Sequence, residues 1–145
     1  MATVFGIGYI QKGAGTVAAL FCCIVWLLCH QTQTSNTLID LICTAFIFFA
    51  GLWSSSLVEK NWGHDSNRIV IDELLGMCVA LLFVPVSLTT VAIAFLFFRF
   101  FDIAKPLYIR RVEKLPGGWG VMTDDLLAGI YANLLLQIIL LMKLL

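Results

Sequence analysis

The chain has 145 residues, of which 61% are hydrophobic and only 12% are charged. A soluble domain of this length cannot bury so much apolar surface, so a lipid environment and one domain, residues 1–145, are expected. Nine basic residues are balanced by nine acidic ones, which leaves no basic surface for nucleic acid. These properties predict an all-α, polytopic helical membrane protein.

The first half of the chain predicts two membrane spans. Thr16 to His30 is an apolar run, and Thr37 to Val58 is long enough to cross a hydrocarbon core of roughly 30 Å. The polar turn between them, Gln31 to Asn36, contains no Lys or Arg. The positive-inside rule therefore places this turn away from the cytoplasm. The chain then returns to the cytoplasm at the polar loop Glu59 to Arg68.

The next apolar stretch, Ile69 to Phe101, predicts a helical hairpin broken at Pro85. Proline removes a backbone donor, and the hydroxyl groups that follow it can satisfy the freed backbone groups. The stretch begins and ends on the same side, because the loop after it, Arg99 to Thr123, is rich in cations and should be cytoplasmic. Each arm would have about 14 to 16 residues, roughly 21 to 24 Å. A re-entrant hairpin and a single kinked span are the alternatives. Asp124 to Leu145 predicts a last helix.

Two similar acidic dyads give the strongest functional signal. Asp72-Glu73 lies in VIDELLG and Asp124-Asp125 in VMTDDLLAG, and each follows a loop assigned to the cytoplasm. Four carboxylates near one membrane face would repel each other, and a hard divalent cation such as Mg²⁺ suits oxygen ligands. We therefore expect the two dyads to approach within about 8 Å and to hold Mg²⁺. The alternative is that acids favour helix N-termini through the helix dipole.

Two further segments suggest groups that bind phosphate. In KGAGT, Lys12 lies beside Gly15 and Thr16, where glycine and a helix N-terminus can accept an anion, although Gly-Thr is also an ordinary cap. In RFFDIAKP, Arg99 and Lys105 are candidate phosphate ligands, and Asp102 is a candidate metal ligand. The alternative for this second segment is an interfacial stretch whose cations reach anionic headgroups.

Four blocks together resemble the bacterial phosphatidylglycerophosphatase A family. They are KGAGT, IVIDELLGM (69–77), FRFFDIAKP (98–106) and GGWGVMTDDLLAGIYA (117–132), in the family's order. The first block departs from the family, because Ala14 stands where a proline is usual. The resemblance implies a Mg²⁺-dependent enzyme of the bacterial inner membrane. Its substrate would be phosphatidylglycerophosphate, which loses its terminal phosphate to give phosphatidylglycerol.

The residues and the resemblance predict a phosphatase site facing the cytoplasm. Asp72, Glu73, Asp124 and Asp125, with Asp102, would hold one or two Mg²⁺, which neutralise phosphate oxygens and activate water. Direct attack by water and attack by a carboxylate through a phosphoenzyme both stay open, as does the oligomeric state. Two rival classes also place carboxylates at a membrane: a small cation channel or transporter, and a structural subunit with a divalent-cation site. Release of phosphate separates the enzyme from both.

Overall fold

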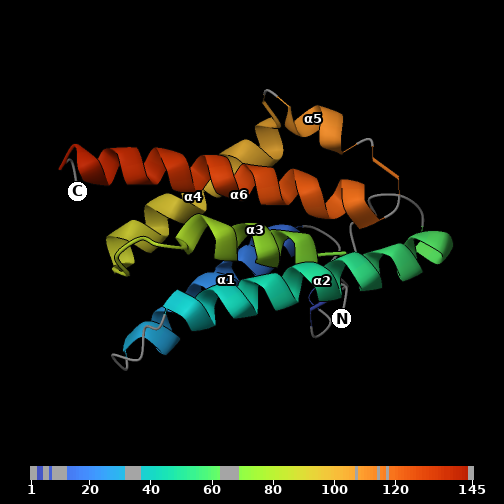
Figure 1. The fold of residues 1–145 in the computed structure, drawn as a ribbon, viewed down its shortest axis with the longest axis horizontal. Helices are drawn as coiled ribbons and strands as arrows, with labels where there is room; N and C mark the ends of the chain where they lie inside the picture. Colours follow the sequence, from blue (N-terminus) through green and yellow to red (C-terminus); the bar gives the residue numbers. More distant parts are fainter. Residues whose placement is uncertain are drawn as a thin grey trace.

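The computed structural model describes residues 3–4, 7, 13–31, 37–62, 69–106, 108–113, 115–116 and 118–143, and in these the regular structure is helical. The all-α class is therefore confirmed. The helices lie lengthwise in an elongated bundle (Figure 1). In chain order they are α1 (Ala14–Gln31), α2 (Thr37–Trp62), α3 (Ile71–Leu81), α4 (Leu88–Ala104), α5 (Ile109–Val112) and α6 (Gly118–Leu141).

Two described helices are long and apolar enough to cross a membrane. They are α2, over Thr37–Leu57, and α6, over Gly118–Leu141, while the apolar stretch of α1, Ala14–His30, is shorter. Helix α2 continues to Trp62, past the predicted end at Val58. Its continuation has a simple cause, because Glu59 and Lys60 are good helix formers and no glycine or proline lies between Val58 and Gly63.

The stretch from Ile69 to Phe101 is not one continuous helix. Helix α3 ends before Leu82, and α4 begins after Ser87, with Pro85 between them. The Ser87 hydroxyl accepts a hydrogen bond from the backbone N–H of Thr90 at 3.1 Å, which caps α4. The two helices pack against each other. The predicted break is therefore present, although the arms, at 11 and 17 residues, are less equal than expected.

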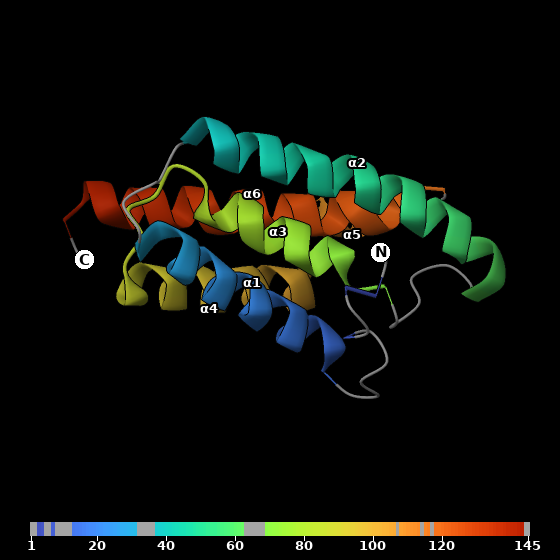
Figure 2. The same cartoon turned by 90° about the horizontal axis from the view of Figure 1, so that it is seen from below.

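Helix α3 forms the centre of the bundle. It packs against α1, α2, α4 and α6, and Figure 2 shows α1 and α2 on either side of it. Most of its residues are buried, including Leu75, Met77 and Leu81. The first turn of α3 carries Asp72 and Glu73. This pair of acidic residues is thus held among the helices, with Asp72 buried and Glu73 partly buried.

Asn133 of α6 completes the C-terminal end of α3. Its side-chain amide donates to the backbone carbonyls of Val79, Ala80 and Leu82, at 3.2, 3.0 and 2.7 Å. The last carbonyls of a helix have no partner within the helix, and water is scarce in a buried bundle. Gln137 in turn donates to the Asn133 side-chain oxygen at 2.7 Å. Because of these hydrogen bonds, α3 can end in the middle of the bundle without leaving its last carbonyl groups unsatisfied.

Candidate metal and phosphate site

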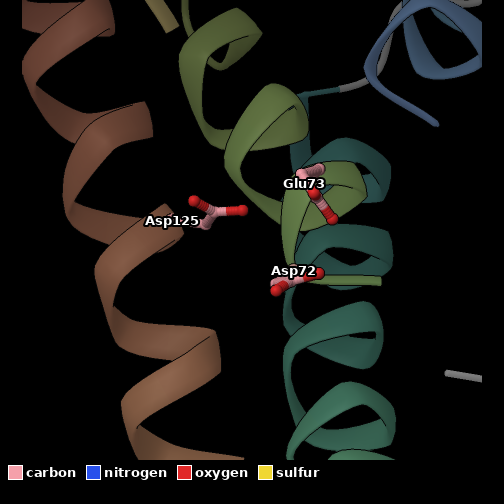
Figure 3. A group of neighbouring side chains, drawn as sticks. All are labelled: Asp72, Glu73 and Asp125. Atoms are coloured by element: carbon pink, nitrogen blue, oxygen red, sulfur yellow. The ribbon is translucent and has the colours of Figure 1, made fainter. Parts of the chain in front are cut away.

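Three carboxylates from α3 and α6 meet at the start of α3. One oxygen from each of Asp72, Glu73 and Asp125 lies within 4.8 Å of the others. Figure 3 shows the Asp125 side chain extending from α6 toward the two acids of α3. Asp72 and Asp125 are buried, and Glu73 is partly buried. We call these three residues the carboxylate trio. Their approach confirms the expectation that the two dyads converge.

A close helix crossing explains why the trio forms. In each dyad an aspartate precedes a glycine by four residues, so that Asp72 and Gly76 share a face of α3, and Asp125 and Gly129 share a face of α6. A Cβ on Gly129 would collide with the carbonyl oxygen of Gly76, and one on Gly76 would lie 2.7 Å from the carbonyl oxygen of Asp125. The helices therefore touch through backbone at the glycines. One turn earlier, the two aspartates are brought face to face.

The trio contains buried oxygens without a hydrogen-bond partner. Within the part of the chain that the structure describes, neither Asp72 Oδ1 nor Glu73 Oε2 has one. Leaving such an oxygen unpaired is costly, and three like charges this close repel each other. Asp102 adds to this charge, because it interacts with both Glu73 and Asp125. A cation with affinity for hard oxygen ligands would satisfy these oxygens and offset the repulsion.

Two cations hold acidic residues next to the trio. Arg99 of α4 forms an ion pair with Asp102 three residues later. Lys105 Nζ lies 2.7 Å from Glu113 Oε1 and 2.7 Å from Asp124 Oδ2. Asp124 also accepts the backbone N–H of Asp125 at 2.9 Å. Asp124 therefore faces Lys105, whereas its neighbour Asp125 faces α3.

The backbone at Lys105 has an unusual conformation. Its φ of 43° and ψ of 53° are left-handed, a region that residues other than glycine rarely occupy, and it ends α4. Its side chain is thereby directed to Glu113 and Asp124. Burial alone would lower the pKa of Lys105, but the hydrogen bonds and charges of Asp124 and Glu113 outweigh it and raise this pKa above its ordinary value. The ammonium group therefore stays charged.

The N-terminal end of α1 lies against the trio. A Cβ on Gly15 would overlap the Glu73 carboxylate, so the absence of a side chain lets the α1 backbone touch that group. Thr16 follows in the first turn and is half-buried. Lys12 lies outside the described residues, so its predicted place beside the phosphate stays a prediction.

The helix-dipole alternative applies to only one dyad. Asp72 and Glu73 do lie in the first turn of α3. The prediction that Asp124-Asp125 opens the last helix is wrong, because α6 begins six residues earlier, at Gly118, and has no acid in its first turn. The backbone N–H of Gly118 donates to the Ser56 hydroxyl at 3.2 Å, so contact with α2 accompanies this earlier start.

Sequence reasoning missed Glu113 and Asn133. Glu113 shares Lys105 with Asp124, but it lies eight residues beyond Lys105, across α5, and no helical spacing links the two. Asn133 did carry a signal, because it is a polar amide one turn after Gly129 in an otherwise apolar run. A buried amide in such a run commonly satisfies backbone groups of a neighbouring helix.

Comparisons with known proteins agree with the four sequence blocks. The family model described as phosphatidylglycerophosphatase A matches residues 1–140. A Bacteroides thetaiotaomicron protein, named as a candidate phosphatidylinositol-3-phosphatase, is 38% identical over 94% of this chain and 89% of its own. A Haemophilus influenzae protein named phosphatidylglycerophosphatase A is 38% identical over 91% of this chain and 82% of its own. An Escherichia coli protein of the same name is 33% identical over 90% of this chain and 76% of its own. No solved structure matches the chain. The chain belongs to the phosphatidylglycerophosphatase A family.

Proposed function

We propose that this chain is a Mg²⁺-dependent lipid phosphatase. It would hydrolyse the terminal phosphomonoester of phosphatidylglycerophosphate, giving phosphatidylglycerol and phosphate. Family membership and the two relatives named phosphatidylglycerophosphatase A support the reaction class. The observation that carries the proposal is the carboxylate trio, which joins oxygens from two helices within 4.8 Å.

The residues present fit a hard divalent cation. Asp72, Glu73 and Asp125 would hold it, since their oxygens are clustered and two of them lack partners among the described residues. Mg²⁺ at such a site neutralises phosphate oxygens and makes a bound water a better nucleophile at neutral pH. Asp102 adjoins the trio and is a further candidate ligand. Asp124 was also expected to be a ligand; we propose that its main role is to orient Lys105.

The surrounding groups would bind and orient the phosphate. Lys105 and Arg99 supply positive charge beside the trio, and positioned charge of this kind stabilises the transition state. Gly15 brings the N-terminal end of α1 to the same place, and the N-terminal end of a helix favours an anion. Lys12 and Thr16 would contribute from that segment. Together these groups hold the phosphorus in line with the attacking oxygen, and the bond to the glycerol oxygen breaks.

We further propose that the site faces the cytoplasm of a bacterial inner membrane. Arg110 and Arg111 are exposed on α5, between the end of α4 and the start of α6. The positive-inside rule assigns such a cationic segment to the cytoplasm. Helices α3 and α4 would then form a hairpin that enters and leaves by this face, and α1, α2 and α6 would cross.

The name of the Bacteroides relative supports one second candidate substrate, phosphatidylinositol 3-phosphate. Both lipids carry a phosphomonoester, so the carboxylate trio serves either. The difference lies in the alcohol that leaves, a flexible glycerol in one case and an inositol ring in the other. Comparing the two lipids at equal surface concentration in detergent micelles therefore separates the two substrates.

Phosphate release by the purified chain tests the proposal. We expect release from phosphatidylglycerophosphate with Mg²⁺, loss of release after chelation, and recovery when Mg²⁺ is restored. Asp72→Asn, purified in the same way, should be inactive. Faster release from phosphatidylinositol 3-phosphate would establish the second candidate. If folded protein with Mg²⁺ releases no phosphate from either lipid, the proposed phosphatase activity is contradicted, and a transporter or a structural subunit is favoured.

A further inference from the structure

A second polar site lies at the other end of the bundle from the carboxylate trio. A pocket of about 510 Å³ opens where α1 ends and α2 begins, against the turn from α3 to α4. Trp26, His30, Thr37 and Asp40 line it, together with residues 83–86 of the turn. His30 is 15 residues beyond Gly15 on α1, or about 22 Å along the helix. A lipid with its phosphate at the trio cannot also place its headgroup here.

The pocket is built around a fixed histidine and aspartate. His30 Nε2 lies 3.2 Å from Asp40 Oδ2, and Nδ1 lies 2.9 Å from the Trp26 carbonyl oxygen. The His30 ring is also stacked on the Trp26 ring, with centroids 4.9 Å apart. Each ring nitrogen of His30 is therefore within hydrogen-bond distance of an oxygen atom. This arrangement holds the Asp40 carboxylate at the pocket wall, where its second oxygen can accept from a ligand.

Trp26 contributes a donor that needs an acceptor. The residue is only 9% exposed, and its indole Nε1 has no hydrogen-bond partner among the described residues. An indole N–H is a donor only, and a buried tryptophan normally finds an acceptor for it. A ligand oxygen would supply this bond. Trp26 and Asp40 both line the pocket, which therefore combines an indole donor that has no acceptor among the described residues with an anionic acceptor.

An apolar groove continues from this polar pocket. A second cavity of about 460 Å³ shares Trp26, His30 and Asp40 with the pocket. Its walls include Phe21 and Val25 of α1 and Ile39 and Cys43 of α2, and its floor is Leu74 and Cys78 of α3. Although His30 of α1 pairs with Asp40 of α2, the backbones of the two helices do not pack against each other over the described residues. Figure 2 shows them on opposite sides of α3.

We propose that the pocket and the groove together bind one glycerophospholipid with a primary ammonium headgroup. The ammonium donates to Asp40, a phosphate or ester oxygen accepts from the Trp26 indole N–H, and one acyl chain lies in the groove between α1 and α2. An anionic headgroup without an ammonium group would instead bring its negative charge to the Asp40 carboxylate. The lipid comes from the membrane leaflet opposite the trio. This site is separate from the proposed catalytic one and does not depend on it.

Native mass spectrometry of the purified full chain tests this inference. Protein in mild detergent is titrated with phosphatidylethanolamine and, separately, with phosphatidylglycerol of the same acyl chains. We expect one phosphatidylethanolamine to be retained about tenfold more tightly, as the loss of the charge-assisted hydrogen bond from the ammonium group implies. Asp40→Asn should remove this preference. Trp26→Phe should weaken retention of phosphatidylethanolamine, whereas the control Trp53→Phe, exposed on α2 and outside both cavities, should not.

A variant in the groove provides a second test in case the pocket variants do not fold. Cys43 is exposed on the groove wall, so Cys43→Trp fills the groove without disturbing the core. It should weaken retention like Trp26→Phe. Equal retention of the two lipids by the wild-type protein would overturn the inference, as would equal binding by Trp26→Phe and Trp53→Phe. Because the readout is lipid retention, it stands whether or not the chain releases phosphate.

Discussion

Single substitutions in the carboxylate trio should have opposite effects with and without metal. Without Mg²⁺, Asp72→Asn or Asp125→Asn removes a buried carboxyl group whose charge is opposed by burial and by its acidic neighbours, so the melting temperature should rise. With saturating Mg²⁺, the wild-type protein should gain stability, about 2.7 kcal/mol at 100 times the dissociation constant. The variants should gain little and lose at least about 100-fold in turnover, since a metal's charge stabilisation amounts to several kcal/mol. Thermal melting across a Mg²⁺ titration measures the stability effects.

Asp40→Asn is the matched control for these variants. Asp40 is also an aspartate of an apolar helix, but it pairs with His30 far from the trio. It should keep the Mg²⁺-dependent rise in melting temperature. A trio variant that melts like the wild-type protein throughout the titration would remove that residue from the ligand set. Asp124→Asn, tested in parallel, shows whether Asp124 binds metal or only orients Lys105.

Lys105 should affect turnover more than metal binding. In Lys105→Met the cation between Asp124 and Glu113 is lost, and with it a charge positioned for the phosphate. We expect turnover to fall about 100-fold or more, the usual effect of removing one stabilising group from a transition state. The apparent Mg²⁺ affinity should change little. Lys105→Arg, which keeps the charge, should recover part of the turnover. A normal rate for Lys105→Met would leave Arg99 and Lys12 as the phosphate ligands.

At the crossing of α3 and α6, Gly129 should not tolerate a side chain. In Gly129→Ala the new Cβ meets the backbone oxygen of Gly76, which cannot rotate away. We expect a loss of about 1–3 kcal/mol in the free energy of unfolding, the usual cost of overpacking. Turnover should fall as well, because Asp125 moves away from Asp72. Chemical denaturation and a rate assay on the same sample measure both effects.

Gly51→Ala is the control for that crossing. The nearest atoms to a Cβ on Gly51 belong to the end of the Met122 side chain, which is flexible and can move aside. It should therefore cost less stability than Gly129→Ala and leave turnover almost unchanged. Equal losses in the two variants would mean that the α3–α6 crossing has no special role in placing the carboxylates.

The sequence predicted which helices form this bundle better than it predicted the residues at which they begin and end. Apolar runs and Pro85 were enough to predict α1, α2, α3 and α4. The start of α6 was misplaced, because the charged loop suggested a break up to Thr123, whereas Gly118 packs against Ser56 of α2. That contact joins segments 62 residues apart, and local composition does not contain it. The bonds from Asn133 to the end of α3 are non-local in the same way.

The candidate site was predictable in composition but not in detail. The repeated pattern of acid, two leucines and a small residue indicated both dyads, and their convergence followed from assigning both to one membrane face. Which member of each dyad faces inward was not predictable. Asp125 points to α3 while Asp124 pairs with Lys105, because adjacent residues of a helix lie about 100° apart. That choice depends on how α6 is rotated against α3.

At the scale of the whole molecule, the proposed topology places the two ends of α6 on opposite sides of the membrane. Tyr108, beside α5, and Met142, after α6, are both exposed. In a variant lacking the five native cysteines, Met142→Cys should react with a membrane-impermeant thiol reagent in intact cells. Tyr108→Cys should react only after the cells are opened. The reverse pattern would place the carboxylate trio on the outer face of the membrane and would contradict the proposed orientation.

The central claim is that the trio holds the catalytic metal, and anomalous scattering tests it most directly. Mn²⁺ shares the preference of Mg²⁺ for oxygen ligands and is visible by its anomalous signal in crystals of the full chain. We predict a peak bonded to carboxylate oxygens of Asp72, Glu73 and Asp125, at about 2.0 to 2.2 Å. The claim would be contradicted if Mn²⁺ were bound only at Asp124 and Glu113. It would also be contradicted if crystals of active protein showed no peak at the trio.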